Sequence, residues 1–458
     1  MSMQKIKTYL TKPSIISIDN FNPRYYEPNF LFVKNNLEKC TNLEIYLEEQ
    51  PKGGSTPPYY LFKDFKDKEI PYVKTSAISR DFLNLNDLHY IHPDYHNKTL
   101  KRSIAKPYDV VFSMTGKFMG KAALVPNIIN ELNMSQNSVV LKTNSKYKSA
   151  YLALYLNSEI NKIQVQGLYT ISKQKYLNQG KIKSLKIIPY KDSLKPILEE
   201  YLKGIDLYYE AYNSFKNAID TINEYYKIPE DITKIKKTFI QKSSMLEHKL
   251  FTPEYYCSDY RSILKTVKDK SLSCKTLDNF VSPKVGDEIG SANYLFEGIP
   301  FIKTSDCINY NIDYQPNYYC SPGLFHSLAQ DVQFSDIILA KDGKIGEIAL
   351  VTDDSNFVCS GGLVKLQSGD LDTQLLLFAI LSSMVGQVQL KMWTVIASTM
   401  AHLRTINFFK ECIIPKLPEE ISMKVLDYCH KGINLRKESS KLINDSKGKI
   451  TDYFLSFK

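Results

Sequence analysis

The sequence has 458 residues, of which 43% are hydrophobic and 24% are charged, with a formal net charge of +10 at pH 7. This length and balance exclude a disordered chain and a small disulfide-bonded scaffold, and they leave room for more than one core. Residues 1–10 lack the apolar run of a signal peptide, no stretch reaches the about 18 apolar residues of a membrane span, and the positive charge favours a polyanionic partner.

The two halves of the chain carry the same short motifs in the same order. Residues 71–76 read PYVKTS, and residues 300–305 read PFIKTS. The other matched stretches are 21–26 with 251–256, 109–112 with 336–339, 123–125 with 349–351, 187–189 with 413–415, and 203–205 with 431–433. Self-similarity at a steady spacing indicates an internal repeat, so we predict two diverged copies of one unit of about 230 residues.

Strands and helices alternate within each predicted copy. The apolar runs at 110–112 and 337–339 predict buried strands. In the second copy Asp342-Gly343 predicts a hairpin turn before a further strand at 348–351, whereas the first copy has Thr115-Gly116 and one extra residue in that loop. The remaining elements are helices at 150–163 and 374–390 and closing strands near Ile187 and Ile413. Each copy is therefore predicted to be an α+β domain.

A long amphipathic helix is predicted after each copy. Apolar residues recur in steps of four and three, as in a coiled-coil seam, and a helix over 193–227 would be about 50 Å long. The seam residues are Leu194, Leu198, Tyr201, Ile205, Tyr208, Tyr212, Phe215, Ile219, Ile222 and Tyr226. The second helix, over 419–454, is less regular, with polar interruptions at Arg436, Ser440 and Lys447.

These elements predict two pseudo-symmetric α+β domains separated by long antiparallel helices. The predicted division is a first domain at 1–190, a long helix at 191–228, a lysine-rich connecting helix at 229–250, a second domain at 251–416 and a terminal helix at 417–458. The alternative is two ordinary amphipathic helices, each packing on its own domain.

Two motifs could carry chemistry. Thr56-Pro57-Pro58-Tyr59 is similar to the Asn/Asp/Ser-Pro-Pro-Tyr motif with which adenine-N6 methyltransferases hold a flipped base, which leaves a solitary methyltransferase as an alternative. However, no Gly-x-Gly loop opens a helix after a strand, as a cofactor loop would. His89, His92 and His96 could bind zinc, but the second copy has no matching histidines, so we expect them to form hydrogen bonds and predict no metal site.

The sequence otherwise lacks a catalytic signature. We find no nucleophile–base arrangement, phosphate-binding loop or paired acidic metal motif. The eight cysteines contain no Cys-x-x-Cys pair, which is typical of reduced thiols in a cytoplasmic protein. A binding protein is therefore the better prediction, and a scaffold that binds only protein is a further alternative.

At this point the chain resembles the specificity subunits of type I restriction-modification systems. In that family a recognition domain opens with a Gly-Gly-x-Thr-Pro-like turn and an Ile-Pro-aromatic-hydrophobic strand. Here residues 53–57 read GGSTP and residues 70–73 read IPYV; in the second copy 299–306 read IPFIKTSD, but only Gly286 remains of the turn. Residues 336–339 (DIIL) with 342–346 (DGKIG) match the family pattern best. The order of domain, helix, domain, helix covers nearly the whole chain.

The resemblance implies a DNA-recognition subunit without catalytic activity. Each domain would read half of a bipartite double-stranded DNA target, and the helices would set the gap and dock two methyltransferase subunits. S-adenosylmethionine, and the ATP and Mg²⁺ of restriction subunits, would belong to those partners and not to this chain. Such a complex serves defence against phage in the cytoplasm.

Loop residues at comparable places in the two copies are the predicted DNA contacts, since cations bind phosphates and polar side chains read base edges. In the first domain they are Lys74, Ser76, Arg80, Lys117, Lys121, Lys173 and Lys175. In the second domain they are Lys303, Ser305, Lys341, Lys344, His402 and Arg404.

Overall fold

The computed structural model describes residues 22–58, 70–116, 119–169, 175–228, 252–397 and 399–457. Contacts between residues divide the chain into two compact units, Met1–Tyr209 with Glu438–Lys458, and Glu210–Lys437. Each long helix is therefore divided between the two units and is not a separate segment. The predicted connecting helix at 229–250 lies outside the described residues.

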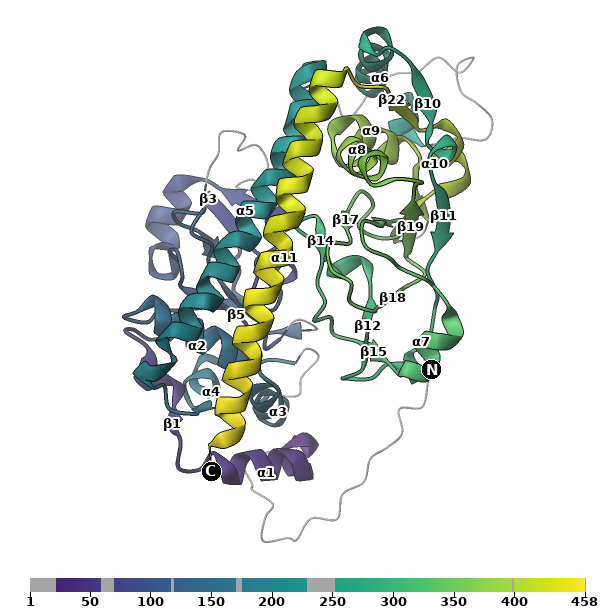
Figure 1. The fold of residues 1–458 in the computed structure, drawn as a ribbon. Helices are drawn as coiled ribbons and strands as arrows, with labels where there is room; N and C mark the ends of the chain where they lie inside the picture. The colour runs from purple at the N-terminus through teal and green to yellow at the C-terminus, as the bar shows by residue number, and fades with distance from the viewer. Residues whose placement is uncertain are drawn as a thin grey trace. The chain divides into compact units, whose positions relative to one another are not determined.

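The first unit combines short strands with helices (Figure 1). Its strands are β1 (Thr41–Asn42), β2 (Lys52–Gly53), β3 (Ile70–Val73), β4 (His89–Ile91), β5 (Val110–Ser113), β6 (Ala122–Leu124), β7 (Asn133–Met134), β8 (Ser138–Leu141) and β9 (Lys186–Ile187). Its helices are α1 (Pro28–Asn36), α2 (Lys146–Asn157), α3 (Glu159–Leu168) and α4 (Gln179–Lys183), followed by the start of α5 (Lys195–Tyr226).

The second unit repeats this order and adds two strand pairs. Its strands are β10 (Cys274–Thr276), β11 (Ser282–Val285), β12 (Ile299–Ile302), β13 (Cys307–Ile308), β14 (Asn311–Ile312), β15 (Tyr319–Cys320), β16 (Ile337–Ala340), β17 (Ile348–Leu350), β18 (Val358–Cys359), β19 (Leu363–Gln367), β20 (Thr394–Ala397), β21 (Met400–Leu403) and β22 (Ile413–Pro415). Its helices are α6 (Ser258–Lys270), α7 (Pro322–Leu328), α8 (Leu371–Ser382), α9 (Met384–Met392) and α10 (Thr405–Glu411), followed by the start of α11 (Glu419–Ser456).

The sheets of the two units have the same topology. Four-stranded sheets run β2-β8-β5-β6 and β11-β19-β16-β17, three-stranded sheets run β4-β3-β7 and β15-β12-β18, and two-stranded sheets pair β1 with β9 and β10 with β22. In both three-stranded sheets the central strand has one antiparallel and one parallel neighbour. The predicted duplication and the α+β fold class are therefore confirmed.

The most apolar predicted strands form the sheet centres. All residues of β5 and β16 are buried, and each strand pairs antiparallel on both sides. The loop after each strand has positive φ at two glycines, Gly116 (70°) and Gly120 (88°) in the first unit and Gly343 (72°) and Gly346 (96°) in the second. Glycine adopts this backbone without a steric penalty, so both copies keep it despite the extra residue in the first loop.

Each predicted central helix is in fact two helices. The break falls at Ser158 between α2 and α3, and at Ser383 between α8 and α9. Each serine caps the second helix, with Ser158 Oγ accepting from Asn161 N and Ser383 Oγ accepting from Val385 N. The apolar pattern continues through the break because α2 and α8 are largely buried, so periodicity alone did not reveal the caps.

The long helix predicted over 193–227 is present as α5, and nine of its ten seam residues are buried, Tyr212 being the half-buried exception. The tyrosines of the seam face the globular part of their own unit. Tyr208 stacks on Phe82 with ring centroids 3.6 Å apart, and Tyr212 stacks on Tyr310 at 5.4 Å. For these residues the alternative of packing on the domain is the one observed.

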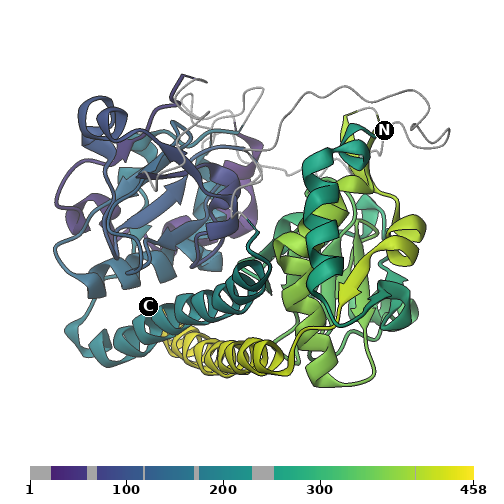
Figure 2. The same cartoon turned by 90° about the horizontal axis from the view of Figure 1, so that it is seen from above.

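Small residues bring α5 and α11 together. In the first unit a Cβ at Gly204 would lie 2.7 Å from Ile443, and in the second a Cβ at Gly432 would lie 2.7 Å from Phe215. Flanking ion pairs repeat in the same way, Lys203 with Glu438 and Lys431 with Glu210. In the first unit Lys203 pairs with Glu438 and Glu200 with Lys449, and in the second Glu210 pairs with Lys431 and Ser214 Oγ donates to the Tyr428 carbonyl. A higher residue number on α5 therefore meets a lower one on α11, so in each unit the two helices, which lie side by side in Figures 1 and 2, are antiparallel.

We expect Gly432→Ala to destabilise the protein by about 1–3 kcal/mol, because the new methyl group would press on the Phe215 ring. Gly448→Ala on the same helix is the matched control, since a Cβ there meets nothing within 4 Å. It should stabilise the helix by up to about 1 kcal/mol. Thermal unfolding of both variants measures the difference, and equal shifts would contradict the close helix contact.

Two of the three polar interruptions of the second seam, Lys447 and Arg436, have buried partners. Lys447 Nζ pairs with Asp81, whose side chain is 0% exposed. Asp81 Oδ1 also accepts from the Tyr201 hydroxyl at 2.8 Å and from Asn157 Nδ2 at 3.1 Å. Arg436 is likewise fully buried, and its Nη2 donates to the Asn309 carbonyl at 2.8 Å. The irregular heptad thus reflects polar contacts between α11 and the globular layers.

The eight cysteines of the chain are all free thiols, seven of them buried. No single helix among the described residues is long and apolar enough to cross a membrane, and α8 with α9 reaches that length only as a pair bent by 65°. Both of these helices are largely buried in the core of the second unit.

Candidate nucleic-acid interface

In the second unit, the turn after β16 and the strand β21 meet at Asp342. Its Oδ1 lies 2.7 Å from His402 Nδ1, and its Oδ2 lies 2.6 Å from Lys341 Nζ. Two backbone bonds fix this arrangement, Gly343 N donating to Ala401 O and Leu403 N donating to Lys341 O, both at 2.8 Å. The carboxylate therefore positions two predicted contact residues that are 61 residues apart in the chain.

The helical turn Thr304–Asp306 (η16) lies beside this turn. A Cβ at Gly362 would lie 3.2 Å from Thr304 Cγ2 and 3.7 Å from the Asp342 Cβ, so both segments flank the same glycine. Lys303, at the start of η16, has its ammonium 4.1 Å from the centre of the Tyr294 ring and 4.3 Å from that of Tyr318. Ring quadrupoles hold the cation in a defined place, which reduces the entropy lost when it binds an anion.

The first unit contains the same junction with different side chains. Thr115 bridges to Tyr176 as Asp342 bridges to His402, and Gly116 N donates to the Lys175 carbonyl at 3.1 Å. Tyr176 therefore occupies the place of His402. The sequence comparison missed Tyr176, because the hydrogen-bond register, and not a shared motif, aligns these strands.

Lys175 lies in a cationic part of this junction. Its ammonium is 5.1 Å from the centre of the Tyr169 ring. Burial, and secondarily the nearby Arg24 guanidinium, lowers the pKa of Lys175. Arg24 was not among the predicted contacts, although its position in the aromatic-rich entry was the available signal. Two adjacent cations at this place favour an anionic ligand.

The other predicted contacts have different surroundings. Lys74, Ser76 and Arg80 are half-buried around the helical turn Thr75–Ala77 (η5), and Ser305, Lys344 and Arg404 are half-buried around the second junction. Lys121 is only 4% exposed, so its ammonium is not presented at the surface of the unit. Lys117 and Lys173 lie outside the described residues.

His92, His96 and Thr56, from the two motifs that the sequence offered as candidates for chemistry, form hydrogen bonds within the first unit. His96 is fully buried, with Nδ1 2.6 Å from Asn133 Nδ2 and Nε2 3.2 Å from Glu131, and His92 Nδ1 accepts from Asp94 N. Among the described residues, no group of three or more His, Cys, Asp or Glu could hold a metal ion. The Thr56 hydroxyl donates to Gln136, and Tyr59 of the same motif lies outside the described residues.

Comparison with known proteins gives structural matches alone. No family model matches the chain, and no curated protein does. The type I restriction-modification S subunit from M. genitalium is 11% identical, with a TM-score of 0.37, covering 90% of this chain and 94% of that one. The HsdS subunit from Thermoanaerobacter tengcongensis is 14% identical, with a TM-score of 0.27, covering 92% and 96%.

A third match comes from a structural study of complex assembly and conformational transition in the type I R-M system. It is 15% identical, with a TM-score of 0.28, covering 89% of this chain and 94% of that one. The matched structures thus bear the name of the family that the sequence motifs resemble.

Proposed function

We propose that this chain is the specificity subunit of a type I restriction-modification complex and that it is not itself an enzyme. One observation carries the proposal: the same sheet topology occurs twice, and each copy leads into a long helix. Two diverged copies of one binding unit suit a target with two different halves. Such a chain would read bipartite double-stranded DNA, one half with each unit.

In the second unit, Lys344 and Arg404 would bind phosphates, while Ser305 and His402 would contact base edges. Lys303 and Lys341 would act as pre-positioned cations, held by rings and by Asp342 respectively. In the first unit, Lys74, Ser76, Arg80 and Lys175 would have the corresponding roles, and Lys117 and Lys173 remain proposed contacts. We leave out Lys121 because it is buried.

The long helices would set the gap between the half-sites and dock the partners. The 32 residues of α5 and the 38 of α11 correspond to lengths of about 48 and 57 Å. Two methyltransferase subunits would bind S-adenosylmethionine and flip the target adenine. Restriction subunits would bring ATP and Mg²⁺, so this chain needs no cofactor of its own.

Co-expression with a type I methyltransferase subunit, followed by mapping of methylated adenines, tests the function. We expect one bipartite sequence with an unspecified gap. Exchanging residues 1–190 for another recognition domain should change one half of that sequence and leave the other unchanged. Methylation without this chain, or an exchange that alters both halves or neither, would contradict the proposal.

Salt dependence tests the proposed phosphate contacts. Lys344→Ala and Arg404→Ala should each weaken DNA binding, and each should reduce the slope of log affinity against log salt by about 0.9, because one fewer counterion is released. Lys268→Ala is the matched control, since Lys268 is an exposed lysine on α6 of the same unit. Equal slopes for all three variants would count against the interface.

A further inference from the structure

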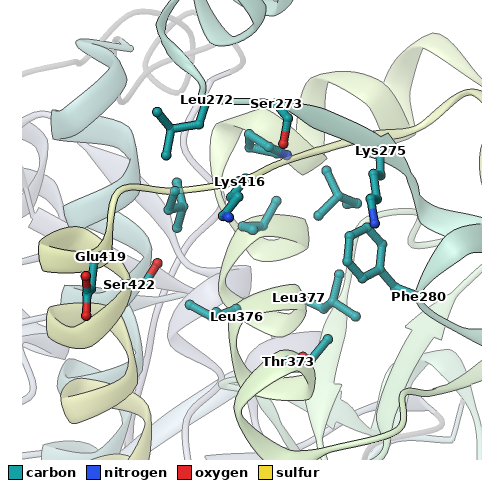
Figure 3. Close-up of a pocket in the computed structure, with 14 residues that line it drawn as sticks. Leu272, Ser273, Lys275, Phe280, Thr373, Leu376, Leu377, Lys416, Glu419 and Ser422 are labelled. Atoms are coloured by element: carbon teal, nitrogen blue, oxygen red, sulfur yellow. The ribbon is translucent and has the colours of Figure 1, made fainter.

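The second unit contains a pocket of 700 Å³ between α8, β22 and the start of α11 (Figure 3). We call it the β22 pocket. Its walls include Phe280, Leu376, Ile380 and Leu417, and Lys275 and Lys416 lie at its edge. This volume is within the about 300–1,000 Å³ that is usual for small-molecule sites. None of these residues belongs to the proposed DNA interface.

Two matching glutamines give the equivalent place in the first unit. Gln164 bonds both backbone groups of Lys186, with its Oε1 accepting from Lys186 N and its Nε2 donating to Lys186 O, both at 3.0 Å. Gln389 bonds Ile413 in the same way, at 2.7 and 3.0 Å. Each glutamine lies in the helix that follows a capping serine, Ser158 or Ser383. These bonds therefore fix which residues of the two units correspond, both along the helix and along the closing strand that border the pocket.

In this register, tyrosines of the first unit stand where the pocket has aliphatic side chains. Tyr151 corresponds to Leu376, Tyr155 to Ile380 and Tyr190 to Leu417. The Tyr151 hydroxyl donates to the Ile188 carbonyl at 2.6 Å, and its ring packs edge-on to that of Tyr190 at 5.5 Å. Larger aromatic side chains therefore stand in the first unit at places where the second unit has smaller aliphatic ones.

The edge of the pocket differs in charge as well. Lys275 replaces Thr41, because both residues pair with the matching isoleucine of the closing strand. Lys416 replaces Pro189 in the same register, which lies one residue away from the sequence match of 187–189 with 413–415. Both lysines are exposed, and neither has an ion-pair partner among the described residues. Among the described residues that line the pocket, Glu419 has the one carboxylate, so the edge has a net positive charge.

We propose that the β22 pocket binds a small planar aromatic anion, such as an aryl carboxylate or sulfonate. The walls carry aliphatic side chains where the first unit has tyrosine rings, and apolar contact supplies affinity there. The two lysines supply the charge that pairs with the anionic group. Binding would be a property of the second unit alone and would not depend on DNA.

Two dyes with the same rings test the proposal on the full-length chain. 8-Anilinonaphthalene-1-sulfonate carries the anionic group, and N-phenyl-1-naphthylamine lacks it. We expect the sulfonate to bind at about one site per chain and at least 10-fold more tightly than the neutral dye, the difference expected from one favourable charge pair. Fluorescence titration measures both dissociation constants.

Variants locate the site. Leu376→Tyr and Leu417→Tyr restore the rings of the first unit and should weaken both dyes at least 10-fold without lowering the unfolding temperature. The double variant Lys275→Thr/Lys416→Met should weaken the sulfonate alone. Undiminished sulfonate binding by either folded tyrosine variant would overturn the pocket assignment. Equal weakening of both dyes by the lysine variant would overturn the anionic preference.

Discussion

Replacing Lys447 with methionine is expected to lower the free energy of unfolding by about 3–5 kcal/mol, because the Asp81 carboxylate would stay buried without its cation. Asp81 would keep the Tyr201 hydroxyl at 2.8 Å and Asn157 Nδ2 at 3.1 Å. These neutral donors hold the carboxylate in place but supply no positive charge. Urea denaturation followed by far-ultraviolet circular dichroism measures the loss.

Two controls separate the buried charge from the loss of a lysine. Lys449→Met removes the ion pair with Glu200, whose side chains are 50% and 44% exposed, so it should cost less than about 1 kcal/mol. In the double variant Asp81→Asn/Lys447→Met no charge remains, and asparagine tolerates the φ of 72° at position 81. It should recover much of the stability, and a loss equal to that of Lys447→Met alone would refute this account.

Gly54→Ala is expected to destabilise the first unit by about 3 kcal/mol or more, at the upper end of overpacking effects. A Cβ there would lie 1.7 Å from the Met134 carbonyl oxygen, which belongs to β7 and cannot rotate away as a side chain would. Gly286 is the equivalent residue, and a Cβ on it would lie 2.3 Å from the Ser360 carbonyl oxygen. Gly286→Ala should therefore show the same kind of loss in the second unit.

Gly323→Ala provides the control for this pair, because a Cβ at Gly323 meets nothing within 4 Å. Its effect should stay within about 0.5 kcal/mol. Thermal unfolding of the three variants gives the comparison. If Gly54→Ala and Gly323→Ala unfolded at the same temperature, the close backbone approach at Gly54 would be wrong. The same approach explains why Gly286 persists in the second copy although the rest of the GGSTP turn is absent.

The sequence alone predicted the repeat, the central strands and the long helices, because these features leave long or duplicated patterns. Strands of two residues such as β7 and β18 carry no periodicity, so they could not be predicted. The helix breaks at Ser158 and Ser383 were also missed, but there the pattern was continuous. The helix before each break is largely buried and apolar residues continue in the helix after it, so the apolar pattern did not reveal the capping serine.

The seam shows how a correct helix prediction can assign the wrong contact. Tyr201, Tyr208 and Tyr212 have coiled-coil spacing, yet each contacts its own globular unit. Glycine and serine make the close helix contact instead, as where Ser439 Oγ donates to the Gly204 carbonyl at 2.7 Å. Heptad spacing reports which face is buried and not which neighbour covers it.

The candidate interface was only partly predictable. A lysine next to a glycine turn identified the loop at 341–344, but the ion pair of Asp342 with His402 depends on the β20–β21 hairpin, which left no clear sequence pattern. The sequence did not predict that Lys121 is buried, because a charged residue between two loops is expected to be exposed. Backbone register, available only from the fold, related Tyr176 to His402.

The matched contacts Gly204–Ile443 and Gly432–Phe215 allow two helix crossings to be compared within one protein. A glycine faces a branched aliphatic side chain in the first unit and a flat ring in the second, Gly204 meeting Ile443 and Gly432 meeting Phe215. A larger residue introduced at both places would therefore meet two chemically different neighbours within one polypeptide, at identical solvent, temperature and expression level.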